Sequence, residues 1–152
     1  MKVYRIEREK YLLQTLSGIG ASLHSSSRWN SEGTRIVYTS QSRSLAMLEA
    51  LVHLDSSDLP SDRFVVEIII PDNVRISTLS KKTLPKNWYQ NPADKSSQLI
   101  GDSFIISSTA AVLKVPSAIV PEEFNYLINP MHPDAKRIKI SRKTKLAFDP
   151  RL

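Results

Sequence analysis

Runs of apolar residues along the chain predict several short strands. Residues 63–70 are rich in β-branched side chains and stop at Pro71, which indicates a central strand of a sheet. Shorter runs of the same kind predict further strands at residues 3–7, 111–115, 125–128 and 137–141. A helix is predicted at about residues 97–107, after a polar loop.

A β-hairpin is predicted over residues 27–40, because a polar stretch with a glycine at 30–34 separates two segments that suit strands. In one register of this hairpin, Arg28 and Tyr38 are diagonal neighbours on the same face, about 7–8 Å apart. A slip of one residue would separate them, and the sequence does not fix the register.

Residues 42–54 give the clearest helical pattern, with Ser42 as a suitable cap and good helix formers in the body. Residues with the i, i+3, i+4, i+7 spacing of a buried stripe are Leu45, Leu48, Glu49 and Val52. The pattern therefore predicts a well-buried helix with Glu49 on its buried face. An ionised carboxylate there needs a cation or several hydrogen-bond donors, which makes Glu49 a candidate for a functional role. Two plainer interpretations are a pairing of Glu49 with His53 and a rotation of the helix that exposes Glu49 to water.

The predicted strands outnumber the helices and do not alternate with them, so the pattern favours an α+β fold. The chain has 152 residues, 41% hydrophobic and 24% charged, which suits one globular domain over residues 1–152. The sequence contains no cysteine, which excludes disulfides, thiolate nucleophiles and cysteine-bound metals. The first residues are charged and every apolar run is short, so we expect a cytoplasmic protein with no membrane partner.

The net charge of +6 is concentrated near the C-terminus. Residues 134–152 carry seven Lys or Arg and two Asp, which gives +5 and leaves +1 for the other 133 residues. Such a segment suits an anionic partner, and it suits a solvated strand face equally well. Residues 136–145 therefore raise one alternative function, a basic nucleic-acid-binding module, although no recognised nucleic-acid motif accompanies them.

Several short motifs are spread along the chain from about Val3 to the C-terminus. They are Ser27-Arg28-Trp29-Asn30, Gly33-Thr34, Val37-Tyr38-Thr39, Leu48-Glu49 with His53-Leu54, Leu84-Pro85 with Trp88, Gln98-Leu99-Ile100-Gly101-Asp102, Val115-Pro116-Ser117-Ala118, Asn125-Tyr126-Leu127-Ile128-Asn129-Pro130 and Phe148-Asp149-Pro150-Arg151-Leu152. In order and spacing they resemble the RES domain, a family named for its Arg, Glu and Ser. Two positions depart from the family pattern: Ser26-Ser27 stand where Gly-Gly is usual, and Phe104 where Trp is expected.

The resemblance implies an ADP-ribosyltransferase-like fold, with a central, mostly antiparallel, split β-sheet flanked by helices. RES proteins are toxins of type II toxin–antitoxin systems, and an antitoxin with an Xre-type helix-turn-helix domain blocks the active site. The implied activity is cleavage of the nicotinamide–ribose bond of NAD+, by hydrolysis or phosphorolysis, with ADP-ribose transfer to a target protein as the alternative. The implied partners are NAD+ and the antitoxin, in a homo-oligomer or a toxin–antitoxin hetero-oligomer that meets DNA only through the antitoxin.

Four residues take roles from this resemblance. Arg28 would bind the phosphates or ribose of NAD+ and help keep Glu49 ionised, and Tyr38 would stack on the nicotinamide ring. Glu49 would stabilise positive charge on the ribose, and Ser117 would hydrogen-bond to the ribose or the amide. Cleavage of an N-glycosidic bond passes through an oxocarbenium-like state, so a fixed anion is the main help a protein can give. NAD+ carries its own leaving group, and we expect no metal and no cofactor beyond NAD+ as the substrate. A further alternative, suggested by Ser26-Ser27, is a catalytically inactive homologue that only binds the antitoxin.

Overall fold

The computed structural model describes the whole chain apart from residues 55–59, 150 and 152. Its elements are β1 (Lys2–Arg8), η1 (Glu9–Tyr11), α1 (Ile19–Ser22), β2 (Val37–Ser40), α2 (Arg43–Leu51), β3 (Arg63–Ile69), β4 (Ile76–Thr78), η2 (Lys81–Thr83), α3 (Lys95–Ser107), β5 (Val112–Pro116), β6 (Phe124–Ile128), η3 (Pro133–Arg137) and β7 (Lys139–Lys145), where η marks a 3₁₀ helix. Two residues of the C-terminal motif, Pro150 and Leu152, lie outside the described residues. None of the helices in the described ranges is long and apolar enough to cross a membrane.

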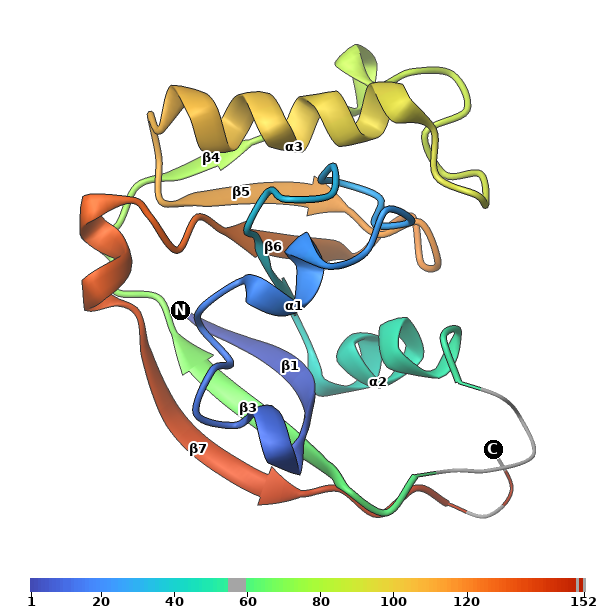
Figure 1. The fold of residues 1–152 in the computed structure, drawn as a ribbon, viewed down its shortest axis with the longest axis vertical. Coiled ribbons are helices and arrows are strands. Elements are labelled where there is room, and N and C mark those ends of the chain that lie inside the picture. The colour runs from blue at the N-terminus through green and yellow to red at the C-terminus, as the bar shows by residue number, and fades with distance from the viewer. Residues whose placement is uncertain (55–59, 150, 152) are drawn as a thin grey trace.

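The strands form one seven-stranded sheet in the order β4-β5-β6-β2-β1-β3-β7. β4 and β5 pair in parallel, and the other neighbouring pairs are antiparallel. β1 pairs with β3 along its whole length, but with β2 only at Tyr4 and Ser40, so the sheet is split between β2 and β1. Figure 1 shows the two halves, with α2 beside the split. The prediction of an α+β fold with a mostly antiparallel, split sheet is confirmed.

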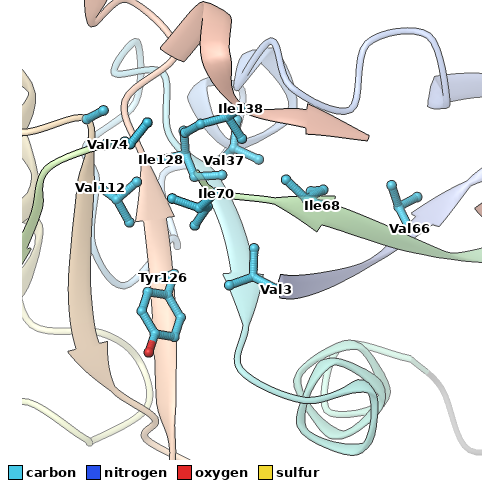
Figure 2. Close-up of a cluster of buried hydrophobic side chains, with 11 residues drawn as sticks. Val3, Val37, Val66, Ile68, Ile70, Val74, Val112, Tyr126, Ile128 and Ile138 are labelled. Carbon is cyan, nitrogen blue, oxygen red and sulfur yellow. The ribbon is translucent and has the colours of Figure 1, made fainter. Parts of the chain in front are cut away.

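Buried apolar side chains fill both faces of the sheet. The cluster on one face is drawn in Figure 2, and Leu12 and Leu16 from the segment after β1 pack against it. The cluster on the other face contains Trp29, Ile36, Phe104, Ala110, Leu113, Val115 and Leu127. Because Trp29 belongs to this second cluster, the segment around Arg28 is packed onto the sheet without being one of its strands.

The predicted hairpin at residues 27–40 is wrong. Residues 27–30 form no strand, because both neighbours of β2 in the sheet are other strands, β6 and β1. The 27–36 segment is instead an irregular loop with a buried centre at Asn30. The Asn30 side chain donates to the carbonyls of Ala21, Ser31 and Thr34, and these bonds replace those of a strand.

The helix predicted at residues 42–54 is confirmed as α2, although it ends at Leu51. The Ser42 side chain caps it by accepting from the Leu45 amide at 3.1 Å. The expectation of a well-buried helix is wrong, since Leu48 is 42% and Val52 is 59% exposed. The helix lies beside β1 and β2 at the split and buries Leu45 and Ala46 near its start, so the rest of its apolar stripe is only partly covered.

Most of the remaining elements match their predicted positions, with shifted ends. β1, β3, β5 and β6 lie where strands are predicted. α3 begins at Lys95, earlier than predicted, because Asp94 caps it. β7 begins at Lys139, later than predicted, because the 3₁₀ helix η3 extends to Arg137. The backbone of β7 pairs with β3, and all of its side chains except that of Ile140 are exposed, as expected for a solvated strand. The three-residue strand β4 is too short to have a clear sequence pattern.

Candidate active site

Glu49 is half-buried on α2, and its carboxylate is held through one of its two oxygens. Oε1 accepts a hydrogen bond from Ser117 Oγ at 2.9 Å and another from Asn125 Nδ2 at 2.5 Å. Oε2 accepts no hydrogen bond from the described residues. The carboxylate is therefore oriented, with one oxygen anchored to the protein and the other available to a ligand.

Ser117 is fully buried in the turn that follows β5, which ends at Pro116. Its Oγ accepts from the backbone amides of Ile119 at 3.0 Å and Val120 at 3.1 Å. Both lone pairs of the hydroxyl are then used, so its proton is directed to Glu49. The sequence-based role of Ser117 is a bond to ribose or amide, whereas the structure uses its hydrogen-bonding groups within the protein.

Asn125 and Ser40 complete the surroundings of Glu49, and neither is among the site residues predicted from the sequence. They lie opposite each other on β6 and β2, and Ser40 Oγ donates to Asn125 Oδ1 at 2.8 Å. Ser40 is 4% and Asn125 is 8% exposed. The available signal was a polar amide at the start of an otherwise apolar strand, since buried polar groups in strands need specific partners.

Tyr38 lies two residues before Ser40 on β2, so the two side chains share one face of the sheet. Its hydroxyl accepts from the Trp29 amide at 3.0 Å and donates to Asn30 Oδ1 at 2.6 Å. Burial raises the pKa of Tyr38, so the hydroxyl stays protonated and keeps donating. Tyr38 therefore fastens the loop that carries Arg28 to the sheet.

Arg28 is half-buried, and its Nη1 donates to the carbonyls of Trp88 and Gln90. Its Nη2 and Nε make no hydrogen bond to any described residue. Burial lowers the pKa of Arg28, and the negative charge of Glu49 partly opposes this effect. Arg28 and Glu49 form no direct ion pair among the described residues, and the expectation that Arg28 helps to keep Glu49 ionised stays a prediction.

Helix α3 supports the Arg28 loop from the other side. Gln98 Nε2 donates to the carbonyls of Ser25 and Ser27 at 2.8 Å each, and Asp102 Oδ1 accepts from the Ser31 amide at 3.0 Å. Gly101 lies between them, and a Cβ atom there would be 1.6 Å from the Trp29 carbonyl oxygen. The Gln-x-x-Gly-Asp motif thus provides a helical surface against which the backbone of the loop packs directly. Asp102 thereby helps to orient the loop.

The sequence-predicted residues therefore form two linked groups, one around Glu49 and Ser117 and one around Arg28 and Tyr38. A cavity of about 150 Å³ lies elsewhere, between β1 and the segment around α1, and its lining includes Arg5, Glu7 and Tyr11. Among the described residues, no group of three or more His, Asp or Glu side chains could hold a metal ion.

Comparisons with known proteins agree with this architecture. The model of the RES domain family matches residues 2–149. A protein of Sphingobium sp. (strain YBL2) named Prs ADP-ribosylating toxin is 46% identical over 144 residues, 93% of this chain and 89% of that protein. A protein of Yersinia enterocolitica named Toxin Res is 39% identical over 153 residues, 100% of this chain and 99% of that protein.

A solved structure has the same fold. It is a crystal structure of the M. tuberculosis MbcT–MbcA toxin–antitoxin complex, with a TM-score of 0.76 and 14% identity, which covers 95% of this chain and 83% of that one. At this identity the likeness concerns the fold alone. Together with the match of the family model and the identity to the curated relatives, it completes the assignment: the chain belongs to the RES domain family and is a toxin of that family.

Proposed function

We propose that this toxin cleaves the bond between nicotinamide and ribose in NAD+, with Glu49 as the catalytic carboxylate. The observation that carries the proposal is the anchored carboxylate itself: two donors hold Oε1, and Oε2 is available to a ligand. A carboxylate fixed in this way can face a developing positive charge without reorganising during the reaction.

The proposed step breaks the C–N glycosidic bond, and its electron pair leaves with neutral nicotinamide. The ribose ring then carries an oxocarbenium-like positive charge, which the Glu49 carboxylate stabilises. An acceptor nucleophile bonds to the same ribose carbon and loses a proton, which completes the balance. The reaction needs no redox partner, and we propose no metal and no second cofactor.

Arg28 is proposed to bind the diphosphate or ribose of NAD+. Its Nη1 is engaged by the Trp88 and Gln90 carbonyls, but its Nη2 and Nε are available, and a guanidinium edge of this kind matches phosphate oxygens. The Tyr38 ring is proposed to stack on nicotinamide, while its hydroxyl holds the loop. For Ser117 we propose an indirect role, the orientation of Glu49, in place of a contact with ribose.

The acceptor of ADP-ribose is proposed to be water or inorganic phosphate. Transfer to a protein is the second candidate, and the name of the Sphingobium relative, Prs ADP-ribosylating toxin, favours it specifically. Both reactions share the cleavage step at Glu49, so the site supports either one.

A protein antitoxin is the proposed partner, because the structural neighbour is the toxin of a toxin–antitoxin complex. We propose that this antitoxin is of the Xre type, that it blocks the active site, and that any contact with DNA is made through it. We propose that the chain binds NAD+ and this antitoxin in the cytoplasm.

Product analysis tests the proposal. Purified, antitoxin-free protein is incubated with NAD+ in the presence and absence of phosphate, and nicotinamide, ADP-ribose and phosphorylated ADP-ribose are separated by chromatography. Nicotinamide release is expected in both buffers, and the second product identifies the acceptor. A parallel reaction with labelled NAD+ and cell extract detects transfer to protein. A correctly folded chain that releases no nicotinamide in any of these reactions would overturn the proposal.

A further inference from the structure

We propose that Ser40 and Asn125 are positioning residues, which fix the Glu49 carboxylate relative to the sheet. The inference rests on the proposed function of Glu49 and deepens it. Its basis is a continuous series of hydrogen bonds from Ser40 Oγ to Asn125 Oδ1 at 2.8 Å, and from Asn125 Nδ2 to Glu49 Oε1 at 2.5 Å.

The direction of each proton in this series is fixed by chemistry. An ionised carboxylate can only accept, so the amide of Asn125 must face Glu49 with its NH₂ group. The amide oxygen then faces Ser40, which must donate its hydroxyl proton to it. Glu49 thus fixes which end of the Asn125 amide faces it, and Ser40 holds the opposite end by donating to Oδ1.

Glu49 needs this support because its own helix gives it little. Leu48 on α2 is 42% exposed and Val52, directly after the helix, is 59% exposed, so neighbouring elements cover this side of the helix only in part. β2 and β6 are interior strands of the sheet, and Ser40 and Asn125 form a direct cross-strand pair on them. Hydrogen bonds from this pair tie a half-exposed helix residue to a rigid element.

Ser40 also lies at the split of the sheet, where it pairs with Tyr4 of β1. On the same face of β2, Tyr38 fastens the Arg28 loop. One short strand therefore positions both groups of the site, Arg28 through Tyr38 and Glu49 through Ser40 and Asn125.

A matched pair of variants on β2 tests the inference. Ser40→Ala removes the hydroxyl that donates to Asn125 Oδ1 and holds this end of the amide. Thr39→Val removes the neighbouring buried hydroxyl, which donates to the Tyr126 carbonyl at 2.7 Å on the opposite face. In nicotinamide release, we expect Ser40→Ala to lower kcat about tenfold with KM changed less than about twofold, the loss expected when a fixed catalytic group becomes loose. We expect Thr39→Val to leave kcat unchanged. Equal losses in the two variants would overturn the inference, since they would indicate general weakening of β2.

Two substitutions of Asn125 distinguish a role in positioning Glu49 from a structural role in which the side chain only fills space. Asn125→Asp has nearly the same shape but replaces the donor with a second carboxylate, and Asn125→Ala removes the side chain. A merely structural role predicts that Asp is the milder change. The positioning role predicts that Asp lowers kcat at least as much as Ala, because it repels Glu49 Oε1. A milder effect of Asp, with both variants folded by circular dichroism, would overturn the inference.

NMR of the free protein gives a readout that does not depend on turnover. We expect the side-chain amide signal of Asn125 to shift in both Ser40→Ala and Glu49→Gln and to stay unchanged in Thr39→Val. An Asn125 signal that does not respond to Ser40→Ala overturns the positioning inference whatever the reaction is. Absence of nicotinamide release from the wild type overturns the proposed function instead, so the two failures are distinct.

Discussion

The hydroxyl of Tyr38 accepts a 3.0 Å hydrogen bond from the backbone amide of Trp29, and this bond places Arg28 beside the sheet. The same hydroxyl donates to Asn30 Oδ1 at 2.6 Å. One side chain on β2 thereby orders the loop on both sides of its buried tryptophan. Arg28 and Tyr38 are neighbours for this reason and not through strand pairing.

Tyr38→Phe is expected to lower the free energy of unfolding by about 1–3 kcal/mol, because it leaves the Trp29 amide and Asn30 Oδ1 without this partner. It should also raise KM for NAD+, since the Arg28 loop is no longer fastened. Tyr126→Phe is the matched control, because the Tyr126 hydroxyl, drawn in Figure 2, makes no hydrogen bond to the described residues. Urea unfolding and NAD+ kinetics measure both effects, and equal results for the two variants would contradict the account.

Gly101→Ala is expected to destabilise the protein strongly, because the added Cβ would lie 1.6 Å from the Trp29 carbonyl oxygen. Helix α3 and the Arg28 loop would have to move apart, which overpacking studies place at about 1–3 kcal/mol or more. Gly20→Ala is the control, since a Cβ there meets no atom within 4 Å. Thermal unfolding should show a large fall in Tm for Gly101→Ala and little change for Gly20→Ala. A Gly101→Ala protein with wild-type stability would show that this close packing is absent.

Two fully buried serines offer a contrast between a bonded and an unbonded hydroxyl. Ser117→Ala removes the donor to Glu49, and we expect kcat to fall by about 10- to 100-fold. Ser97 on α3 is equally buried, but its Oγ has no hydrogen-bond partner among the described residues. Ser97→Ala should therefore leave kcat unchanged and raise Tm, because it removes an unsatisfied hydroxyl from a helix. A Ser117→Ala enzyme with full activity would contradict the role given to this serine.

The ion-pair cluster around Glu67 predicts a pH dependence of stability. Lys2, Ser141 and Arg43 hydrogen-bond to the Glu67 carboxylate and lower its pKa from an ordinary 4.5 to about 2. Because the pKa is lower in the folded state, the stabilisation is complete above pH 4.5 and is lost as the pH falls toward 2.

Glu67→Gln should therefore flatten the fall in the urea midpoint between pH 5 and pH 2, a window that spans the two pKa values. The exposed Glu122 provides the control, and Glu122→Gln should keep the wild-type pH dependence. If Glu67→Gln also kept the full wild-type dependence, the cluster would not be the cause.

The periodicity of the sequence predicts the sheet-forming segments and the helix of Glu49 well, because buried strands such as β3 carry a dense β-branched pattern. It fails at residues 27–30, where a polar loop with suitable flanks suggests a hairpin. The hairpin does not form because β1 and β6 pair with the two edges of β2, which leaves no edge for residues 27–30. No sequence pattern near residue 30 indicates this long-range pairing.

The charged residues of the candidate site could be predicted from the sequence, but the polar residues that hydrogen-bond to them could not. A carboxylate on an apolar helix stripe is visible in the sequence, and so is a nearby arginine. Asn125 and Ser40 are not visible in this way, since their role depends on strand register between β2 and β6. The role of Ser117 also depends on geometry, because only the turn reveals that its lone pairs are used by Ile119 and Val120.

The proposed role of the Glu49 carboxylate is to promote cleavage of the nicotinamide–ribose bond. Its most direct test is the initial rate of nicotinamide release at saturating NAD+ for the wild type and for Glu49→Gln, which keeps the shape of the side chain and removes its charge. We predict steady release by the wild type and a fall in kcat of at least about 100-fold in the variant, with an unchanged Tm. A folded Glu49→Gln protein that keeps more than about a tenth of the wild-type rate would contradict the claim.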